Sequence, residues 1–364
     1  MTFKTDFDNF RAGTIFNAAK VKNKPKLTLN KISISYPSRL EAMALDPSRI
    51  VDNNNLVYEA GQINFSIRIF KDISVSIDRN STEITTSKTN KRKALVLHAA
   101  LLMKQALGFN EGLHIDVHNE VDLRHCGLGS SSSLIAGTAA AINEMFGSPI
   151  DRHDLVQYCA QNHGEEVGGS DTELVPVQCI GGSAVGGHYD GGLIILAGQA
   201  SPIYRFNFET DIPVVIGVPE DFSPSDSKEL MDLEIENISG FEKTGSQYGR
   251  EIAYRLVHEV MPGLQNGNLK NCKSLIFDYR WNMGSIDNCS FVYPRMKDIA
   301  KKLRPMEKDD DIEIISLSSV GPGFFAITKK PDLVTKKFNE LGLKTYGTST
   351  FNGTYQITNK QDAK

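Results

Sequence analysis

A run of glycines and serines leads directly into an apolar segment at residues 124–137, RHCGLGSSSSLIAG. The residues that follow, LIAGTAAAINEMF, place apolar side chains near helical spacing and are rich in good helix formers. Upstream, LHIDVHNEVDL begins with the alternation of apolar and polar residues that is typical of a half-buried strand. A flexible linker would not lead into a buried helix. The sequence therefore predicts a glycine-rich turn between a strand and a helix.

This turn has the composition of an anion site. Gly127 and Gly129 permit positive φ and close approach of another group, and the first turn of a helix attracts negative charge. The loop is neither a Walker A loop nor a GxGxxG turn, because no Lys follows the glycines and serines follow Gly129. We expect phosphate here, with serines as caps and donors; a plain helix cap is the alternative. The candidate residues are Gly127, Leu128, Gly129, Ser130, Ser131, Ser132 and Ser133.

Composition restricts the class of protein. A chain of 364 residues is long enough for two domains, and its net charge of -4 with dispersed Lys and Arg does not predict a nucleic-acid groove. Five cysteines without CxxC spacing suggest a reducing, cytoplasmic compartment. No apolar run approaches membrane-spanning length, and the first residues lack the apolar core of a signal peptide. We therefore expect a cytoplasmic protein that binds neither nucleic acid nor membrane.

The periodicity along the chain predicts an α+β fold with two domains. Alternating strands open the chain, helices dominate from about residue 225 to 305, and the end reads as strand, glycine-rich turn, strand, helix, strand. The alternation lacks the regular βαβ rhythm of a doubly wound sheet. The expected divisions are an extension at 1–30, a first domain at 31–215 and a second at 216–364.

Three motifs in order resemble the GHMP superfamily, named for galactokinase, homoserine, mevalonate and phosphomevalonate kinases. GLGSSSS resembles its central phosphate-binding motif, SSVGPGFFAI its C-terminal glycine-rich motif, and YPSRL its first motif. The resemblance implies an N-terminal domain like ribosomal protein S5 domain 2 and a ferredoxin-like C-terminal α/β sandwich. Relatives are commonly homodimers, which makes a homodimer the expected assembly.

Within that superfamily, PSRL, RHCGLGS and GGSAVGGHYDGGLII are similar to the β-ribofuranosylaminobenzene 5'-phosphate synthase and C-nucleoside synthase branch. This similarity implies a transferase that uses 5-phosphoribosyl 1-diphosphate, releases pyrophosphate and joins ribose 5-phosphate to a small aromatic acceptor. Backbone donors of the loop and Mg²⁺ would neutralise the leaving group. An ATP-dependent small-molecule kinase is the alternative, because the same loop can hold the phosphates of ATP. A binding protein without activity is a third possibility.

The two enzymes would use nearly the same residues. Asp171 or Asp190 is the candidate catalytic carboxylate, and Asp171 fits either reaction. Glu165 and Glu166 are candidates for Mg²⁺, with a solvated acidic pair as the alternative. The remaining candidates for phosphate or substrate binding are Arg39, His125, Ser319, Gly321 and Gly323.

Overall fold

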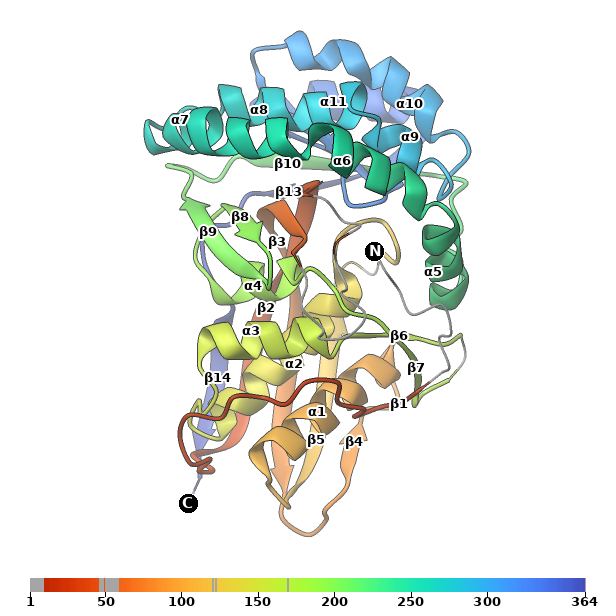
Figure 1. Cartoon of the computed structure of the whole chain (residues 1–364). Coiled ribbons are helices and arrows are strands. Elements are labelled where there is room, and N and C mark those ends of the chain that lie inside the picture. Colours follow the sequence, from red (N-terminus) through yellow and green to blue (C-terminus); the bar gives the residue numbers. More distant parts are fainter. Residues whose placement is uncertain are drawn as a thin grey trace.

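The computed structural model describes residues 10–45, 49, 59–119, 121, 123–168 and 170–363. Within these residues the chain forms the expected α+β fold, with a strand-rich lower half and a helical layer above it (Figure 1). Residues 1–9 of the expected extension lie outside the described part. Among the described residues, no helix is both long and apolar enough to cross a membrane.

A seven-stranded sheet forms the lower half. Its path is β14-β2-β3-β5-β4, and β8 pairs with β3 and with β9. Strands β2 and β3 have 17 and 18 residues and pair antiparallel along most of their length. At about 3.3 Å per residue each spans roughly 55 Å, so both reach from the base of the sheet to the second half. The strands are β2 (Leu29–Leu45), β3 (Gly61–Asp78), β4 (Ile84–Thr86), β5 (Gly112–Asn119), β8 (Leu193–Ala197), β9 (Ser201–Phe206) and β14 (Gln356–Asp362).

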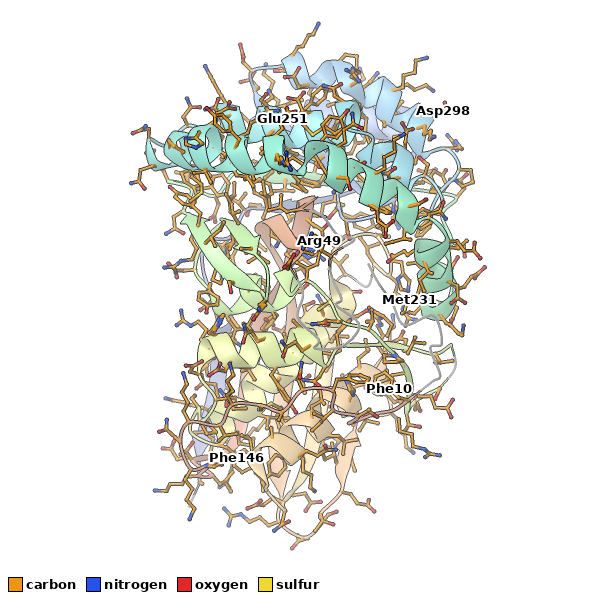
Figure 2. All side chains as sticks on the ribbon, in the orientation of Figure 1. Phe10, Arg49, Phe146, Met231, Glu251 and Asp298 are labelled. Carbon is orange, nitrogen blue, oxygen red and sulfur yellow. The ribbon has the colours of Figure 1, made fainter. Side chains whose placement is uncertain are left out.

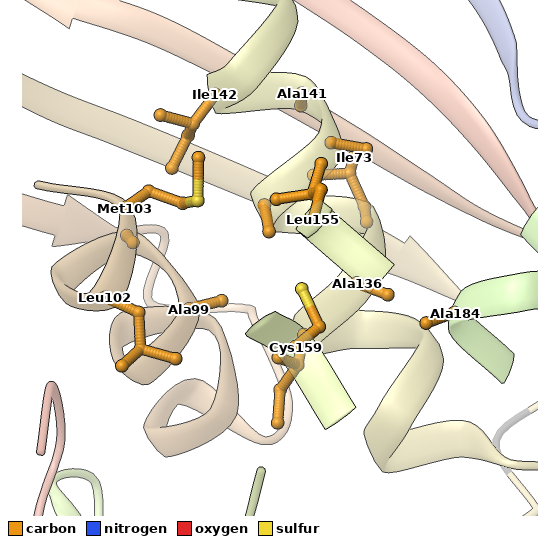
Figure 3. Packing of buried hydrophobic residues seen from close by; sticks show 14 of the residues in the cluster. Ile73, Ala99, Leu102, Met103, Ala136, Ala141, Ile142, Leu155, Cys159 and Ala184 are labelled. Atoms are coloured by element: carbon orange, nitrogen blue, oxygen red, sulfur yellow. The ribbon is translucent and has the colours of Figure 1, made fainter. Parts of the chain in front are cut away.

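Four helices pack in the lower half against this sheet and one another (Figure 3). Alanines and Gly137 keep α2 thin, and a Cβ at Gly137 would lie only 2.6 Å from Cδ1 of Ile73. The close approach buries the whole length of α2, which fixes the position of its N-terminal end. The helices are α1 (Lys93–Leu107), α2 (Ser130–Met145), α3 (Arg152–Gln161) and α4 (Gly182–His188).

The second half contains a four-stranded antiparallel sheet in the order β11-β12-β10-β13. Its apolar side chains form one core with α9, α10 and α11 and another with the upper strands of the first sheet. The strands are β10 (Pro213–Pro219), β11 (Ile312–Leu317), β12 (Phe324–Thr328) and β13 (Leu343–Ser349). The helices are α5 (Ser227–Glu236), α6 (Ile238–Arg255), α7 (Met261–Gln265), α8 (Lys270–Phe277), α9 (Ser285–Cys289), α10 (Met296–Leu303) and α11 (Pro331–Glu340), with the shorter turns η2 (Leu256–Val260), η3 (Asp278–Asn282) and η4 (Arg304–Lys308).

A small third sheet, in the order β1-β7-β6, lies at the edge of the lower half. The middle strand, β7, follows the expected Mg²⁺ residues in the sequence. It pairs with β6 on one side and with residues 10 and 11 of β1 on the other. This pairing fixes the N-terminal segment to the body. The strands are β1 (Phe10–Arg11), β6 (Gly164–Glu166) and β7 (Glu173–Pro176).

The sequence pattern missed two features. No helix was predicted in the glycine-rich segment 182–188, but this segment forms α4, and Gly187 lets it lie against the ring of Tyr36. The end of the chain contributes a second strand, β14, which pairs with β2 of the first sheet. The expected domain boundary between residues 215 and 216 falls inside β10.

Candidate active site

The N-terminal end of α2 is left open for an anion. Gly129 occupies the N-cap position with φ 64°, in the left-handed region. The serines do not cap the helix: the hydroxyl of Ser133 donates back to the carbonyl of Gly129 at 2.7 Å. Within the described part of the chain, no hydrogen bond occupies the amide groups of Ser130, Ser131 and Ser132. These groups and the positive end of the helix dipole create a site for negative charge.

The glycines of this loop are required by close contacts. A Cβ at Gly129 would lie 2.1 Å from Oγ of Ser183, and a Cβ at Gly127 would lie 2.2 Å from the carbonyl oxygen of Ser318. Gly127 also has φ 82°. The loop therefore lies between the start of α4 and the C-terminal glycine-rich loop, and it has no room for side chains.

A cavity of about 220 Å³ opens in front of this loop, between the two halves of the molecule. Side chains of α5 and α6, among them Met231 (Figure 2) and Phe241, form its apolar wall. The polar wall comes from β2, the loop and β6. Of the expected site residues, those that line this cavity are Arg39, His125, Gly127, Leu128, Gly129, Ser130, Ser131, Ser132, Glu165, Ser319 and Gly321.

Arg39 carries a buried positive charge beside the loop. Arg39 is only 9% exposed. Its Nη1 donates to the carbonyl of Gly127 at 2.9 Å, and its Nη2 lies 3.5 Å from the carboxylate of Glu41. Its Nε has no hydrogen-bond partner among the described residues and lies 3.1 Å from where a Cβ of Gly129 would be. A buried donor without a partner is costly, so this Nε is suited to an anionic ligand.

Glu165 is the carboxylate at the loop. Its Oε2 accepts from the hydroxyl of Ser131 at 2.7 Å and its Oε1 lies 3.1 Å from Nε2 of His163. Burial alone would raise the pKa of Glu165, but the hydrogen bond with His163 and the charges of His163 and Arg92 lower it to about 2. The group is thus ionised at neutral pH. Carboxylate and hydroxyl oxygens are the protein ligands that Mg²⁺ accepts.

Glu166 faces the other way. Both of its oxygens accept from Nε of Arg92 at 2.9 Å, and Nη1 of Arg124 lies 3.4 Å from it. It lines a second, polar cavity of about 350 Å³ that shares His125 and Ser227 with the first. Among the described residues no cluster of three or more His, Cys, Asp or Glu side chains has the arrangement of a metal site.

Neither aspartate proposed for catalysis lies in the first cavity. Asp171 lines the second cavity, where its side chain is 65% exposed and lies 3.3 Å from Nζ of Lys93. Asp190 is 55% exposed, pairs with Arg205 and is absent from the lining of both cavities. Among the described residues, the carboxylates of the first cavity belong to Glu41, Glu165 and Glu234.

The remaining expected residues support the loop. His125 lies between the two cavities, 3.3 Å from Oγ of Ser227, and burial lowers the pKa of its imidazole. Gly323 does not line the first cavity, but a Cβ there would lie 2.4 Å from the carbonyl of Cys126. The C-terminal glycine-rich loop therefore packs directly against the phosphate-binding loop.

Sequence reasoning missed several ionisable groups of the cavity, among them Glu41, His163, Glu234 and Arg280. His163 and Arg280 are almost fully buried, and Glu234 lies on α5, far along the chain from the motifs. Burial and the negative charges of Glu165 and Glu41 raise the pKa of Glu234 to about 8. No spacing signal links Glu234 and Arg280 to the loop, because only the packing of the two halves brings them there, whereas His163 lies two residues from Glu165 in the same half as the loop.

Comparison with known proteins agrees with this geometry. Residues 94–182 match the family model described as GHMP kinases N terminal domain. A homoserine kinase from Methanococcus maripaludis is 23% identical over 265 residues, which are 72% of this chain and 77% of the relative. A 4-diphosphocytidyl-2-C-methyl-D-erythritol kinase from Desulfitobacterium hafniense is 26% identical over 104 residues, covering 29% of this chain and 36% of the relative.

Solved structures share the fold. A homoserine kinase from Cytophaga hutchinsonii superposes with a TM-score of 0.57 at 15% identity, covering 90% of this chain and 97% of the other. A mevalonate diphosphate decarboxylase from Staphylococcus aureus gives a TM-score of 0.61 at 12% identity, covering 91% and 98%. The two-domain α+β fold expected from the sequence is confirmed.

The expectation of a phosphoribosyl diphosphate-dependent C-glycosyl transferase is wrong. The homoserine kinases that match over more than two thirds of the chain favour the kinase alternative instead. The error has a physical origin, since one loop of backbone donors serves the diphosphate of either substrate. Residues 94–182 thus match the N-terminal domain of GHMP kinases, and the chain shares its fold with homoserine and mevalonate kinase structures.

Proposed function

We propose that this protein is an ATP-dependent kinase that phosphorylates a hydroxyl group of a small molecule. The observation that carries the proposal is the open N-terminal end of α2 at the cavity, with the buried Nε of Arg39 directed at it. Such a site holds the β- and γ-phosphates of a nucleotide through backbone donors and one guanidinium. The kinase relatives support the same reading.

Mg²⁺ fits the residues at the loop. Ser131 and the ionised Glu165 would hold it, and the remaining positions would be filled by phosphate oxygens and water, as Mg²⁺ prefers. The ion would supply charge neutralisation on the phosphates. Glu166 is the weaker candidate, because it does not line the cavity in front of the loop and both of its oxygens accept from the guanidinium of Arg92.

The chain's own residues do the positioning. The terminal P–O bond of ATP breaks as the acceptor oxygen bonds to phosphorus, and ADP leaves with the bonding electrons. Arg39 stabilises the negative charge on the transferred group, and the apolar side chains of α5 and α6 exclude water. The acceptor's proton goes to a cavity carboxylate; we assign Glu41, which lines the cavity two residues from Arg39 and accepts from Gln62.

The second cavity would take the nucleoside part of ATP. It shares His125 and Ser227 with the first cavity, so a ligand whose phosphates lie at α2 can extend into it. Its lining is polar and carries both signs of charge, in Lys93, Arg124 and Asp171. This placement gives Asp171 a role in nucleotide binding instead of acid–base chemistry.

The test is ADP release from MgATP with a panel of small alcohols. Homoserine is the first acceptor to try, because several relatives carry that name, and mevalonate is the second. We expect one acceptor class to raise ADP release above the rate with water alone. Arg39→Gln should lower that rate, whereas Arg68→Gln, which removes an exposed arginine paired with Asp211, should not. Absence of MgATP binding by calorimetry would reject the proposal.

A further inference from the structure

Arg280 is a buried arginine whose charge no described carboxylate pairs with. It lies in η3 and is 2% exposed. Its Nε donates to the carbonyl of Ala42 at 2.9 Å, its Nη1 to Oγ of Ser285 and the carbonyl of Ser319 at 3.0 Å each, and its Nη2 to the carbonyl of Glu41 at 3.2 Å. Removing a charged group from water is costly, and the compensation here comes from neutral oxygens and from the ring of Tyr279, whose centroid lies 5.3 Å from the guanidinium carbon. A buried arginine of this kind is retained where its hydrogen bonds are needed to hold the neighbouring segments in place.

The acceptors come from three separate segments. Ala42 and Glu41 belong to β2, Ser319 belongs to the C-terminal glycine-rich loop, and Ser285 begins α9. Only the planar fork of an arginine presents donors in all these directions at once. Arg280 thus holds the helical half against the strand that carries Arg39.

Two further hydrogen bonds extend this contact to the phosphate-binding loop. The amide of Glu41 donates to Oγ of Ser318 at 3.0 Å, and that hydroxyl donates to the carbonyl of Gly127 at 2.7 Å. The amide of Ser319 donates to the carbonyl of Glu41 at 3.0 Å, the same oxygen that Arg280 contacts. A displacement at Arg280 therefore reaches Gly127 through two residues.

We infer that Arg280 is a positioning residue that sets the phosphate-binding loop from the helical half of the molecule, through Glu41 and Ser318. The loop cannot shift independently of the C-terminal glycine-rich loop, because Gly127 packs against the carbonyl of Ser318. The chain of hydrogen bonds fixes the donors of α2 relative to Arg39. The expected effect on MgATP binding rests on the proposed kinase activity, whereas the effect on the position of the loop does not.

Hydrogen exchange tests the structural part without any substrate. In Arg280→Lys, we expect faster exchange in the peptides that cover residues 39–42, 126–131 and 316–321, because a lysine ammonium cannot reach all the acceptors. Arg304→Lys is the matched control, since exposed Arg304 contacts Trp281 and Asn282 of the same turn but none of those loops. Unchanged exchange in these three peptides, or faster exchange spread evenly over the chain, would overturn the inference.

Ser318→Ala interrupts the same path one step later and removes only a single hydroxyl from the core. It should accelerate exchange at 126–131 as Arg280→Lys does. In the double variant the two effects should not add, as expected for residues in one network. Full additivity would mean that Arg280 and Ser318 act independently and would reject the path.

Binding then separates this inference from the proposed function. We expect the Kd for MgATP to rise about tenfold to a hundredfold in Arg280→Lys, the range for hydrogen bonds to charged groups. Arg304→Lys should bind as the native protein does. If the native protein binds no MgATP, the kinase proposal fails while the exchange experiment still decides the role of Arg280. If it binds MgATP and Arg280→Lys binds equally well, the positioning role fails and the kinase proposal stands.

Discussion

The hydroxyl of Ser131 donates to Oε2 of Glu165 across 2.7 Å, which joins the first turn of α2 to strand β6. Ser131 also accepts from Nη2 of Arg92 at 2.7 Å, so its hydroxyl is fully oriented. The carboxylate of Glu165 is in turn held by His163. Two oxygen ligands suitable for Mg²⁺ are therefore fixed beside the phosphate-binding loop before any ligand arrives.

Replacement of Glu165 by Gln should weaken Mg²⁺ binding. Changes outside the first coordination shell already cost roughly 10–100-fold in metal affinity, so loss of a ligand should cost at least about tenfold. The measurement is the rate of ADP formation against Mg²⁺ concentration at fixed ATP. Glu251→Gln is the control, because Glu251 is an exposed side chain of α6 (Figure 2) outside the lining of both cavities. An unchanged Mg²⁺ requirement in Glu165→Gln would assign the ion to other residues.

Gly129→Ala should abolish nucleotide binding. The new Cβ would lie 2.1 Å from Oγ of Ser183, and the residue would need φ 64°. Gly108→Ala provides the matched control, because Gly108 also has positive φ, 67°, but a Cβ there meets no atom within 4 Å. Both variants pay about 1–2 kcal/mol for the left-handed conformation. Calorimetry with MgATP should therefore show lost binding only in Gly129→Ala, and equal losses in both would refute the steric argument.

Glu234 should make the stability of the ligand-free protein depend on pH. Burial and the charges of Glu165 and Glu41 raise its pKa to about 8, above the value of 4.5 for a free glutamate. The folded state then binds the proton more tightly than the unfolded state does. The stabilisation is complete below about pH 4.5 and is lost as the pH rises through about 8.

Melting temperatures of native protein and Glu234→Gln across pH 5 to 9 check this assignment. The melting temperature of the native protein should fall relative to that of the variant as the pH rises, because the amide of the variant cannot ionise. Parallel curves for the two proteins would show that Glu234 titrates normally.

Two adjacent glycines of α4 should respond differently to alanine. A Cβ at Gly187 would lie 2.0 Å from Cζ of the buried ring of Tyr36, whereas a Cβ at Gly186 comes no closer than 3.3 Å to Oγ of Ser66 and 3.8 Å to Cβ of Arg39. Overpacking costs about 1–3 kcal/mol, while alanine in an accommodating helical site can gain up to about 1 kcal/mol over glycine. Denaturant unfolding should show Gly187→Ala destabilised and Gly186→Ala near native, and the reverse order would contradict the packing of α4 on β2.

The sequence predicted the parts of the molecule that local patterns encode. The glycine–serine turn and the helix after it lie where the apolar periodicity puts them, although the serines do not cap that helix. Helix α4 was missed because glycine opposes helix formation, and only close contacts with the sheet explain its glycines: Gly182 faces Gln62 and Asn64, and Gly187 faces the ring of Tyr36. Local propensity cannot report a tertiary contact of this kind.

The cavity was harder to foresee than the fold. Glu41, Glu234 and Arg280 come from three distant segments, and the motif that identifies the loop carries no information about them. The sequence also could not separate the kinase from the phosphoribosyl transferase, because their phosphate sites use the same backbone donors. The assignment of individual site residues and the expected homodimer stay predictions.

Strand β14 pairs with β2, although 310 residues of chain separate the end of one from the start of the other. During synthesis the lower sheet therefore lacks its outer strand until the whole helical half has left the ribosome. Until then β2 exposes an unpaired edge that can join other chains. The nascent protein should need shielding on that side, and a version rearranged to start with β14 should aggregate less while it is being made.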